Sequence, residues 1–241
     1  MLFRMVKLLL TFTIGGYYML QTIIFDAYGT LISTGNGSIS AAQTILDRNS
    51  SDASAKEFYA RWKQLHKAHI QGMTAFHKEE DVFLWDLEQL YSEYHFSRDP
   101  ATDVQVMLHT LGRRRAFPET NETLEHLKKR YLVCIGSTTD TSPLIRDLEN
   151  NHITVHHVFT SESLQAYKPQ RIFYEEILKQ LRINPAEALF VGDSLEDDVF
   201  GPQQIGMKTC WINRKDQPLT NATPDFQIKT LSELISMNFE E

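Results

Sequence analysis

Apolar and polar residues alternate in two different ways along the chain. Short apolar runs rich in β-branched residues, flanked by polar ones, are typical of buried strands. Such runs cover residues 22–25, 131–136, 156–160, 187–192 and 208–212. Segments with apolar residues at helical spacing separate them and predict helices over residues 118–130, 142–151, 169–181 and 195–206. Strands that alternate with helices in this way predict an α/β fold with a mostly parallel sheet covered on both faces.

A long stretch after the first strand has only helical spacing. Residues 56–70 place Phe58, Trp62 and Leu65 on one helical face, and residues 79–96 show the same pattern. We take Ser38 and Asp52 as helix caps. The pattern predicts a core formed by residues 19–34 and 113–241, and a helical insertion, residues 35–112, after the first strand.

The first eighteen residues have a basic start and an apolar continuation, as a leader or anchor would. The apolar stretch over residues 8–20 is shorter than the ~20 residues that span a bilayer. It also runs without a linker into the strand at residues 22–25. We therefore interpret residues 1–18 as an N-terminal extension, either a misassigned start or an apolar leader, and consider a membrane partner unlikely.

Composition narrows the possible partners and compartment. The chain has 241 residues, 42% of them hydrophobic, so it can bury a full core. A net charge of −7 argues against binding nucleic acid, because a phosphate backbone needs a basic surface. Cys134 and Cys210 lie in apolar runs, which suits buried, reduced thiols and a cytoplasmic protein. Nothing in the pattern reveals an oligomeric state.

Polar residues that can take part in catalysis or ligand binding gather where the predicted strands end. In parallel sheets, ligands bind beyond the carboxyl ends of the strands. The candidates there are Asp26, Tyr28, Thr30, Ser137, Thr138, Lys168, Asp193, Asp197 and Asp198. Carboxylates brought together repel one another and need a compensating cation. A hard divalent ion between Asp26 and Asp193, with Lys168 beside it, would supply that compensation.

These residues fall into four motifs that resemble those of the haloacid dehalogenase superfamily of aspartate-nucleophile hydrolases. The motifs are FDAYGTL, IGSTTD, YKP and GDSLEDD, and the resemblance covers about residues 21–240. It implies a Rossmann-like core, a helical cap and a covalent intermediate on Asp26. It also implies that Ser137 and Lys168 contact the transferred group, with Thr138 and Thr30 as further substrate-binding candidates.

The same resemblance implies a magnesium site. Its ligands would be Asp26, the Tyr28 carbonyl, Asp193 and a further acid, either Asp197 or Asp198. The sequence leaves open which of these two acids faces the metal.

Two departures from the superfamily pattern point in opposite directions. Tyr28 stands where phosphatases of the superfamily have an aspartate that protonates the leaving group. Such general acid catalysis raises the rate by about 10²–10⁴. A halide leaves without a proton, and the tyrosine resembles the 2-haloacid dehalogenases, as does Tyr174. Asp193, however, keeps the metal-binding acid that those metal-independent enzymes lack. Nor is their cap arginine evident, Arg61 being the nearest candidate.

Weighing the two departures, we predict a magnesium-dependent hydrolase of a small phosphate ester that acts through an aspartyl phosphate. Tyr28 would be an unusual proton donor, so aryl or acyl phosphates should react faster than alkyl phosphates. The first alternative is a metal-independent 2-haloacid dehalogenase that acts through an aspartyl ester. The second is a non-catalytic binding protein with the same fold.

Weaker signals have simpler interpretations. His66 and His69 lie one helical turn apart, but no further ligand stands at zinc-site spacing, so we take them as polar positions of a cap helix. Arg113, Arg114 and Arg115 lie at the return from cap to core, where we expect a solvated hinge.

Overall fold

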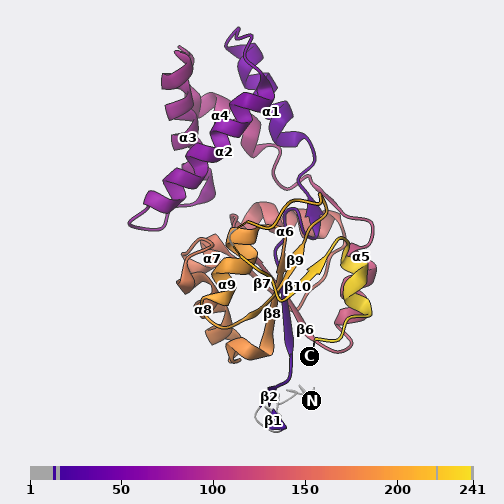
Figure 1. Cartoon of the computed structure of the whole chain (residues 1–241). Coiled ribbons are helices and arrows are strands. Elements are labelled where there is room, and N and C mark those ends of the chain that lie inside the picture. Colours follow the sequence, from indigo (N-terminus) through magenta and orange to yellow (C-terminus); the bar gives the residue numbers. More distant parts are fainter. Residues whose placement is uncertain (1–12, 15–16, 221, 240–241) are drawn as a thin grey trace, which may run out of the picture.

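A six-stranded parallel sheet forms the centre of the molecule. The computed structural model describes residues 13–14, 17–220 and 222–239 (Figure 1). The strands run in the order β10-β9-β8-β3-β6-β7, and every neighbouring pair is parallel. They are β3 (Thr22–Phe25), β6 (Leu132–Ser137), β7 (His157–Thr160), β8 (Ala188–Gly192), β9 (Lys208–Ile212) and β10 (Phe226–Ile228). The predicted fold class is confirmed.

Both faces of this sheet are buried, as the continuous apolar runs predicted. Along β3, Ile23 and Phe25 join one apolar cluster with Leu124 and Leu144, whereas Ile24 joins a second cluster with Phe173 on the opposite face. The helical elements of the core are α5 (Thr120–Leu127), α6 (Thr141–Asn150), α7 (Ser161–Leu164), α8 (Arg171–Leu181), η1 (Pro185–Glu187), η2 (Leu195–Phe200), α9 (Gly201–Gln203) and η3 (Leu231–Ile235).

Four helices form a cap with an apolar core of its own. They are α1 (Gly37–Arg48), α2 (Ala55–Gly72), α3 (Glu79–Tyr94) and α4 (Pro100–Leu108). Phe58, Trp62 and Leu65 of α2 are buried against Leu87 and Leu90 of α3. Two short antiparallel strands, β4 (Ile32–Ser33) and β5 (Arg115–Ala116), carry the chain into the cap and back. Figure 1 shows the cap standing beyond one end of the sheet, joined to it by these strands.

The structure corrects several local predictions. Helix α1 begins after Asn36 and α2 begins after Ser54, whose side chain accepts a hydrogen bond from the Glu57 N–H, so Ser38 and Asp52 are not the caps. The helix predicted over residues 195–206 is a π-helical turn followed by the short α9. The strand β10 has only three residues, too few for an alternation to reveal it.

The N-terminal segment is described only in part. Strands β1 (Thr13–Ile14) and β2 (Tyr17–Tyr18) pair antiparallel, and the rest of the extension predicted over residues 1–18 lies outside the described residues. Within the part of the chain that the structure describes, no helix combines the length and apolarity needed to cross a membrane. Cys134 and Cys210 are both buried and free of disulfide bonds.

Candidate active site

Asp26 lies at the carboxyl end of β3, where two hydrogen-bond donors hold one of its oxygens. The Ser137 hydroxyl, at the end of β6, donates to Asp26 Oδ1 over 3.1 Å, and Lys168 Nζ donates to the same oxygen over 2.8 Å. The parallel β3–β6 register brings these strand ends to one edge of the sheet. Among the described residues Oδ2 has no hydrogen-bond donor, so this oxygen is left for attack on a substrate.

Asp198 is the second acid that Lys168 holds, with Nζ and Oδ1 2.6 Å apart. It is almost fully buried, and the Ser194 N–H donates to its other oxygen over 2.9 Å. The Ser194 side chain accepts from the Asp197 N–H, which starts the π-helical turn η2. Asp198 therefore faces the nucleophile, whereas Asp197 lines the cleft above it and does not join the acid cluster.

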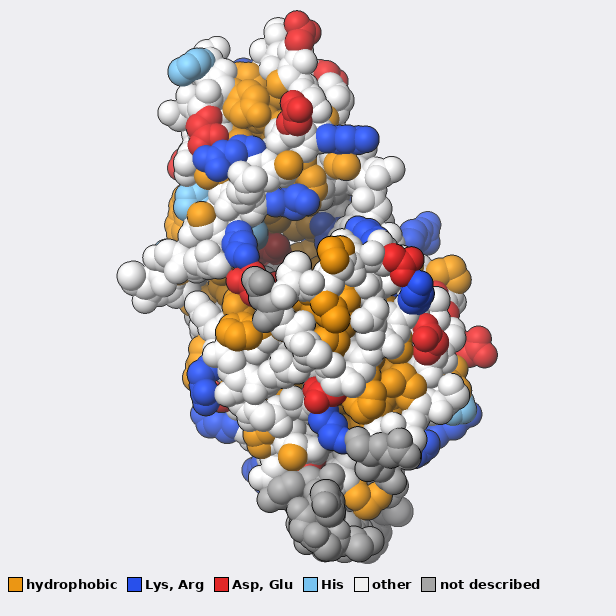
Figure 2. All heavy atoms as spheres, viewed as in Figure 1, with side chains coloured by type: hydrophobic (Ala, Val, Ile, Leu, Met, Phe, Trp, Pro, Cys, Tyr) orange, Lys and Arg blue, Asp and Glu red, His pale blue; other side chains and the backbone are white. Residues whose placement is uncertain are grey.

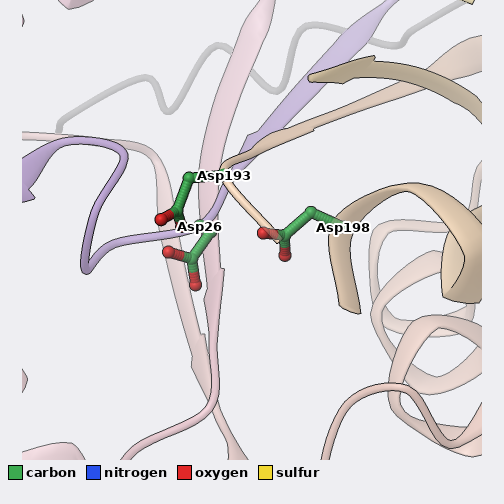
Figure 3. Close-up of side chains that lie close together, drawn as sticks. All are labelled: Asp26, Asp193 and Asp198. Carbon is green, nitrogen blue, oxygen red and sulfur yellow. The ribbon is translucent and has the colours of Figure 1, made fainter. Parts of the chain in front are cut away.

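Asp193 completes a cluster of three carboxylates. One oxygen each from Asp26, Asp193 and Asp198 all lie within 4.8 Å of one another (Figure 3). Glycines make the room: a Cβ on Gly29, whose φ is +96°, would lie 2.3 Å from Asp193 Oδ2, and one on Gly192 would lie 2.2 Å from the Asp198 carboxyl. Oxygen donors in this arrangement fit a hard divalent cation.

The charges of the cluster do not balance. Burial and then the charge of Asp26 raise the pKa of Asp193 to about 6. Burial also raises the pKa of Asp198, although Lys168 opposes that rise. For Lys168 burial works against the charge, but Asp198 and Asp26 outweigh it and raise its pKa above the ordinary value. One lysine thus faces three acids, and the site favours a further cation or a bound proton.

Tyr28 does not turn its hydroxyl toward the acids. The hydroxyl donates to Asp147 Oδ2 over 3.0 Å, and the Arg114 guanidinium lies over the ring, 4.4 Å from its centroid. Burial and the charge of Asp147 raise the pKa of Tyr28 above its ordinary value, against the opposing effect of Arg114. A phenol held in this way is a poor proton donor to a leaving group.

A cleft of about 430 Å³ separates the cap from these residues. Its lining includes Tyr28, Trp62, Lys63, His66, Lys67, Glu79, Arg114, Thr138, Lys168, Glu196 and Asp197. Figure 2 shows lysine and arginine side chains around the hollow between cap and core. The cleft therefore joins an apolar, aromatic cap surface to charged side chains of both signs, and its lysine and arginine side chains supply the positive charge that a small anionic substrate needs.

Three substrate-binding candidates from the sequence have different positions. Thr138 lines the cleft, next to Ser137. Thr30 is fully buried and does not line the cleft, which speaks against the predicted contact with substrate. Arg61 does not line the cleft either, because Glu93 binds its guanidinium through two hydrogen bonds of 2.8 and 2.6 Å. The expected cap arginine is therefore not Arg61.

The two cap histidines bind a buried carboxylate. His66 Nδ1 and His69 Nδ1 each lie 2.7 Å from an oxygen of Asp86, and Trp62 donates to the same group over 3.1 Å. Burial lowers the pKa of His66, but the Asp86 hydrogen bond and charge outweigh it and raise the value. His66 lines the cleft and His69 does not. The sequence revealed neither Asp86 nor Asp147 as a partner.

Comparisons with known proteins agree with this fold, an α/β core with an inserted helical cap. The family model of the haloacid dehalogenase-like hydrolases matches residues 20–206. The chain therefore belongs to this family and is a hydrolase.

The chain is similar to two named relatives and to one solved structure. It is 27% identical over 223 residues to (S)-2-haloacid dehalogenase 4A of Burkholderia cepacia, a match that spans 89% of this chain and 93% of the relative. It is 34% identical to glyceraldehyde 3-phosphate phosphatase of Pyrococcus furiosus, but over 103 residues, 41% of this chain and 42% of the relative. A dehalogenase crystal structure, 27% identical, superposes with a TM-score of 0.74 over 89% of this chain and 95% of that one.

Proposed function

We propose that this chain is a 2-haloacid dehalogenase that acts through an ester formed on Asp26. The sequence alone predicts a phosphate-ester hydrolase first and a 2-haloacid dehalogenase as the alternative. The comparisons favour the alternative, because similarity to the named dehalogenase extends over cap and core, whereas the phosphatase named above matches less than half of the chain.

The position of the Tyr28 hydroxyl is the observation that carries the proposal. Tyr28 replaces the aspartate that donates a proton in phosphatases of the superfamily, and its 3.0 Å hydrogen bond to Asp147 commits the hydroxyl proton elsewhere. Without a proton donor, a reaction that expels an alkoxide is slower by about 10²–10⁴. A halide needs no proton, because it departs as a stable anion. Lys168 meanwhile binds both Asp26 and Asp198, so it stabilises the ionised nucleophile without a metal.

The chemistry needs only these residues and water. Asp26 Oδ2 attacks carbon 2 of the haloacid, the carbon–halogen bond breaks, and halide leaves with the bonding pair. Water then adds to the Asp26 carboxyl carbon, and the bond from that carbon to the ester oxygen breaks. The carboxylate of Asp26 is restored, and the product is a 2-hydroxy acid. One water proton ends on the product hydroxyl and the other is released to solvent. Ser137 and Lys168 stabilise the negative charge on the carboxyl oxygen during the second step.

One observation favours a second candidate, magnesium-dependent hydrolysis of a small phosphate ester. The cluster of Asp26, Asp193 and Asp198 offers a hard cation three oxygens, and Gly29 and Gly192 leave room for the carboxylates. Those three residues would hold Mg²⁺, which would neutralise charge on a phosphoryl group. In that case Ser137 and Lys168 would bind the equatorial oxygens while Asp26 attacked.

A paired assay separates the two candidates. Purified protein is incubated with 2-chloropropionate or with a panel of aryl, acyl and alkyl phosphates, each with Mg²⁺ or with EDTA, and free halide and phosphate are measured. We expect halide release that EDTA leaves unchanged and that Asp26→Asn abolishes. Phosphate release that requires Mg²⁺, without halide release, would contradict the dehalogenase proposal and support the second candidate.

A further inference from the structure

Arg114 presents a fixed positive charge to the cleft. It lies directly before β5, and its guanidinium carbon lies over the Tyr28 ring, 4.4 Å from the centroid. Tyr28 in turn is two residues beyond the nucleophile. Arg114 and Lys168 line the same cleft, and Lys168 Nζ binds the nucleophile Asp26 over 2.8 Å, so a substrate that enters through this cleft and contacts Lys168 also comes near this guanidinium.

A single buried carboxylate fixes both members of this stack. Asp147 is fully buried, and its Oδ1 accepts a hydrogen bond from the Arg114 backbone N–H over 2.7 Å. Its Oδ2 accepts the Tyr28 hydroxyl over 3.0 Å. One carboxylate therefore holds both the Tyr28 ring and the Arg114 backbone, with the guanidinium over the ring.

Among the described residues, the Arg114 side chain forms no salt bridge, whereas two other cleft cations are engaged. Lys168 pairs with Asp26 and Asp198, and Lys67 pairs with Glu196. The acid that faces Arg114 is Glu79, whose pKa burial raises while His66 and Arg114 lower it. Glu79 accepts a hydrogen bond from the Thr139 hydroxyl instead of pairing with the arginine within 4.0 Å. Lys63 also lines the cleft but is exposed, on a flexible stem.

We propose that Arg114 binds the anionic group of the substrate that is not attacked, and that Tyr28 is its positioning residue. This inference rests on the proposed function, for which the bound group is the carboxylate of the 2-haloacid. A planar guanidinium binds a carboxylate through two parallel hydrogen bonds, and a pre-placed one loses little freedom on binding. The tyrosine of the first motif thus has a recognition role, and the anion-binding arginine comes from the hinge instead of the cap.

The test compares an acid with its uncharged amide. We expect Arg114→Gln to lower kcat/KM for 2-chloropropionate about 30- to 100-fold, mainly through KM, because a charged hydrogen-bonded partner is lost. The same variant should change kcat/KM for 2-chloropropionamide less than about threefold, since the amide carries no charge to bind. Arg114→Lys should restore part of the acid activity. Arg113→Gln is the matched control, because Arg113 is exposed and lies outside this cleft.

The positioning role has its own readout. Tyr28→Leu removes the aromatic ring under the guanidinium. Like Arg114→Gln, it should lower the ratio of kcat/KM for the acid to kcat/KM for the amide. Tyr28→Phe keeps that ring, and we expect it to retain most of the preference for the acid. Equal acid-over-amide ratios in Tyr28→Leu and the wild type would overturn the positioning role.

A binding measurement keeps this inference separate from the proposed reaction. In the Asp26→Asn background, which removes the nucleophile, titration calorimetry with 2-chloropropionate should show an affinity that Arg114→Gln lowers at least tenfold and Arg113→Gln leaves unchanged. If the wild type releases no halide, the proposed function fails, and inorganic phosphate replaces the haloacid in the same titration. The inference itself is overturned if Arg114→Gln and Arg113→Gln bind these anions alike.

Discussion

The cap and the core each hold a network around a fully or almost fully buried aspartate, Asp86 in the cap and Asp198 in the core, and the two networks differ in how their charge is balanced. In the cap, Asp86 has side-chain donors from Trp62, His66 and His69. In the core, Asp26, Asp193 and Asp198 crowd together, and the only cation among the described residues that forms an ion pair with any of them is Lys168. Burial is similar for Asp86 and Asp198, so burial does not distinguish them. The difference is the ratio of donors to acids.

This difference separates structural from reactive carboxylates. A buried acid with enough donors stabilises the fold, and its removal leaves those donors unpaired. A cluster with excess negative charge costs stability and persists where chemistry needs it. The variants below test this contrast from its largest expected effect to its smallest.

Asp26→Asn should produce the largest change, and in activity alone. The amide cannot attack, so we expect turnover to fall by about four orders of magnitude or more. Its oxygen still accepts from Ser137 and Lys168, so the melting temperature should stay at or above that of the wild type. Halide release and thermal denaturation check the two halves. An active variant would show that Asp26 is not the nucleophile.

Lys168→Met should produce the largest loss of stability. It leaves Asp26 and Asp198 without their shared cation, and breaking a buried pair in this way costs about 3–5 kcal/mol in free energy of unfolding. Urea denaturation measures the loss. Lys179→Met, at an exposed ion pair, is the control and should change stability by less than about 1 kcal/mol. Adding Asp198→Asn to Lys168→Met should recover part of the loss. If the double variant is no more stable, the charge argument is wrong.

Asp86→Ala tests the buried cap carboxylate that accepts hydrogen bonds from three side chains. Removal of the carboxylate leaves three side-chain donors without their acceptor, which we expect to lower the free energy of unfolding by about 2–3 kcal/mol. Glu88→Ala, an exposed acid on the same helix, should have an effect within about 0.5 kcal/mol. Equal melting curves for the two variants would show that the Asp86 network does not hold the cap together.

Asp193→Asn should have the smallest effect on the free energy of unfolding. Unlike Lys168→Met and Asp86→Ala, it should raise this free energy. Because the folded-state pKa of about 6 lies above the ordinary value of 3.8, the ionised form is disfavoured in the folded protein. The penalty is absent below about pH 4 and complete above about pH 6. Solvent screens it, so with EDTA at pH 8 the variant should be more stable by about 1 kcal/mol, and at pH 4 equal to the wild type. Denaturation at both pH values checks this, and a loss of stability at pH 8 would contradict it.

The core part of the site could be predicted from sequence because its geometry follows from topology. Parallel strands end at one edge, so residues at or directly after the ends of β3, β6 and β8 must meet there, and Asp26, Ser137 and Asp193 do. The choice between Asp197 and Asp198 could not be made in this way. The turn that carries them is π-helical, so α-helical spacing does not tell which of the two faces inward.

The contacts that depend on packing between distant elements also escaped prediction. Tyr28 and Asp147 are 119 residues apart, and no local pattern links them. Arg114 resembles its exposed neighbours Arg113 and Arg115 in sequence, yet it alone of the three lines the cleft. A one-residue shift in register would have placed another arginine there.

Oxygen tracing in a single turnover tests the central claim, an ester on Asp26 that water opens at the carboxyl carbon. Enzyme in excess over 2-chloropropionate reacts in H₂¹⁸O, and mass spectrometry then examines the 2-hydroxy acid and the peptide containing Asp26. The account predicts ¹⁸O in the Asp26 carboxylate and an unlabelled product hydroxyl. Label in the product of this first turnover, with Asp26 unlabelled, would contradict it.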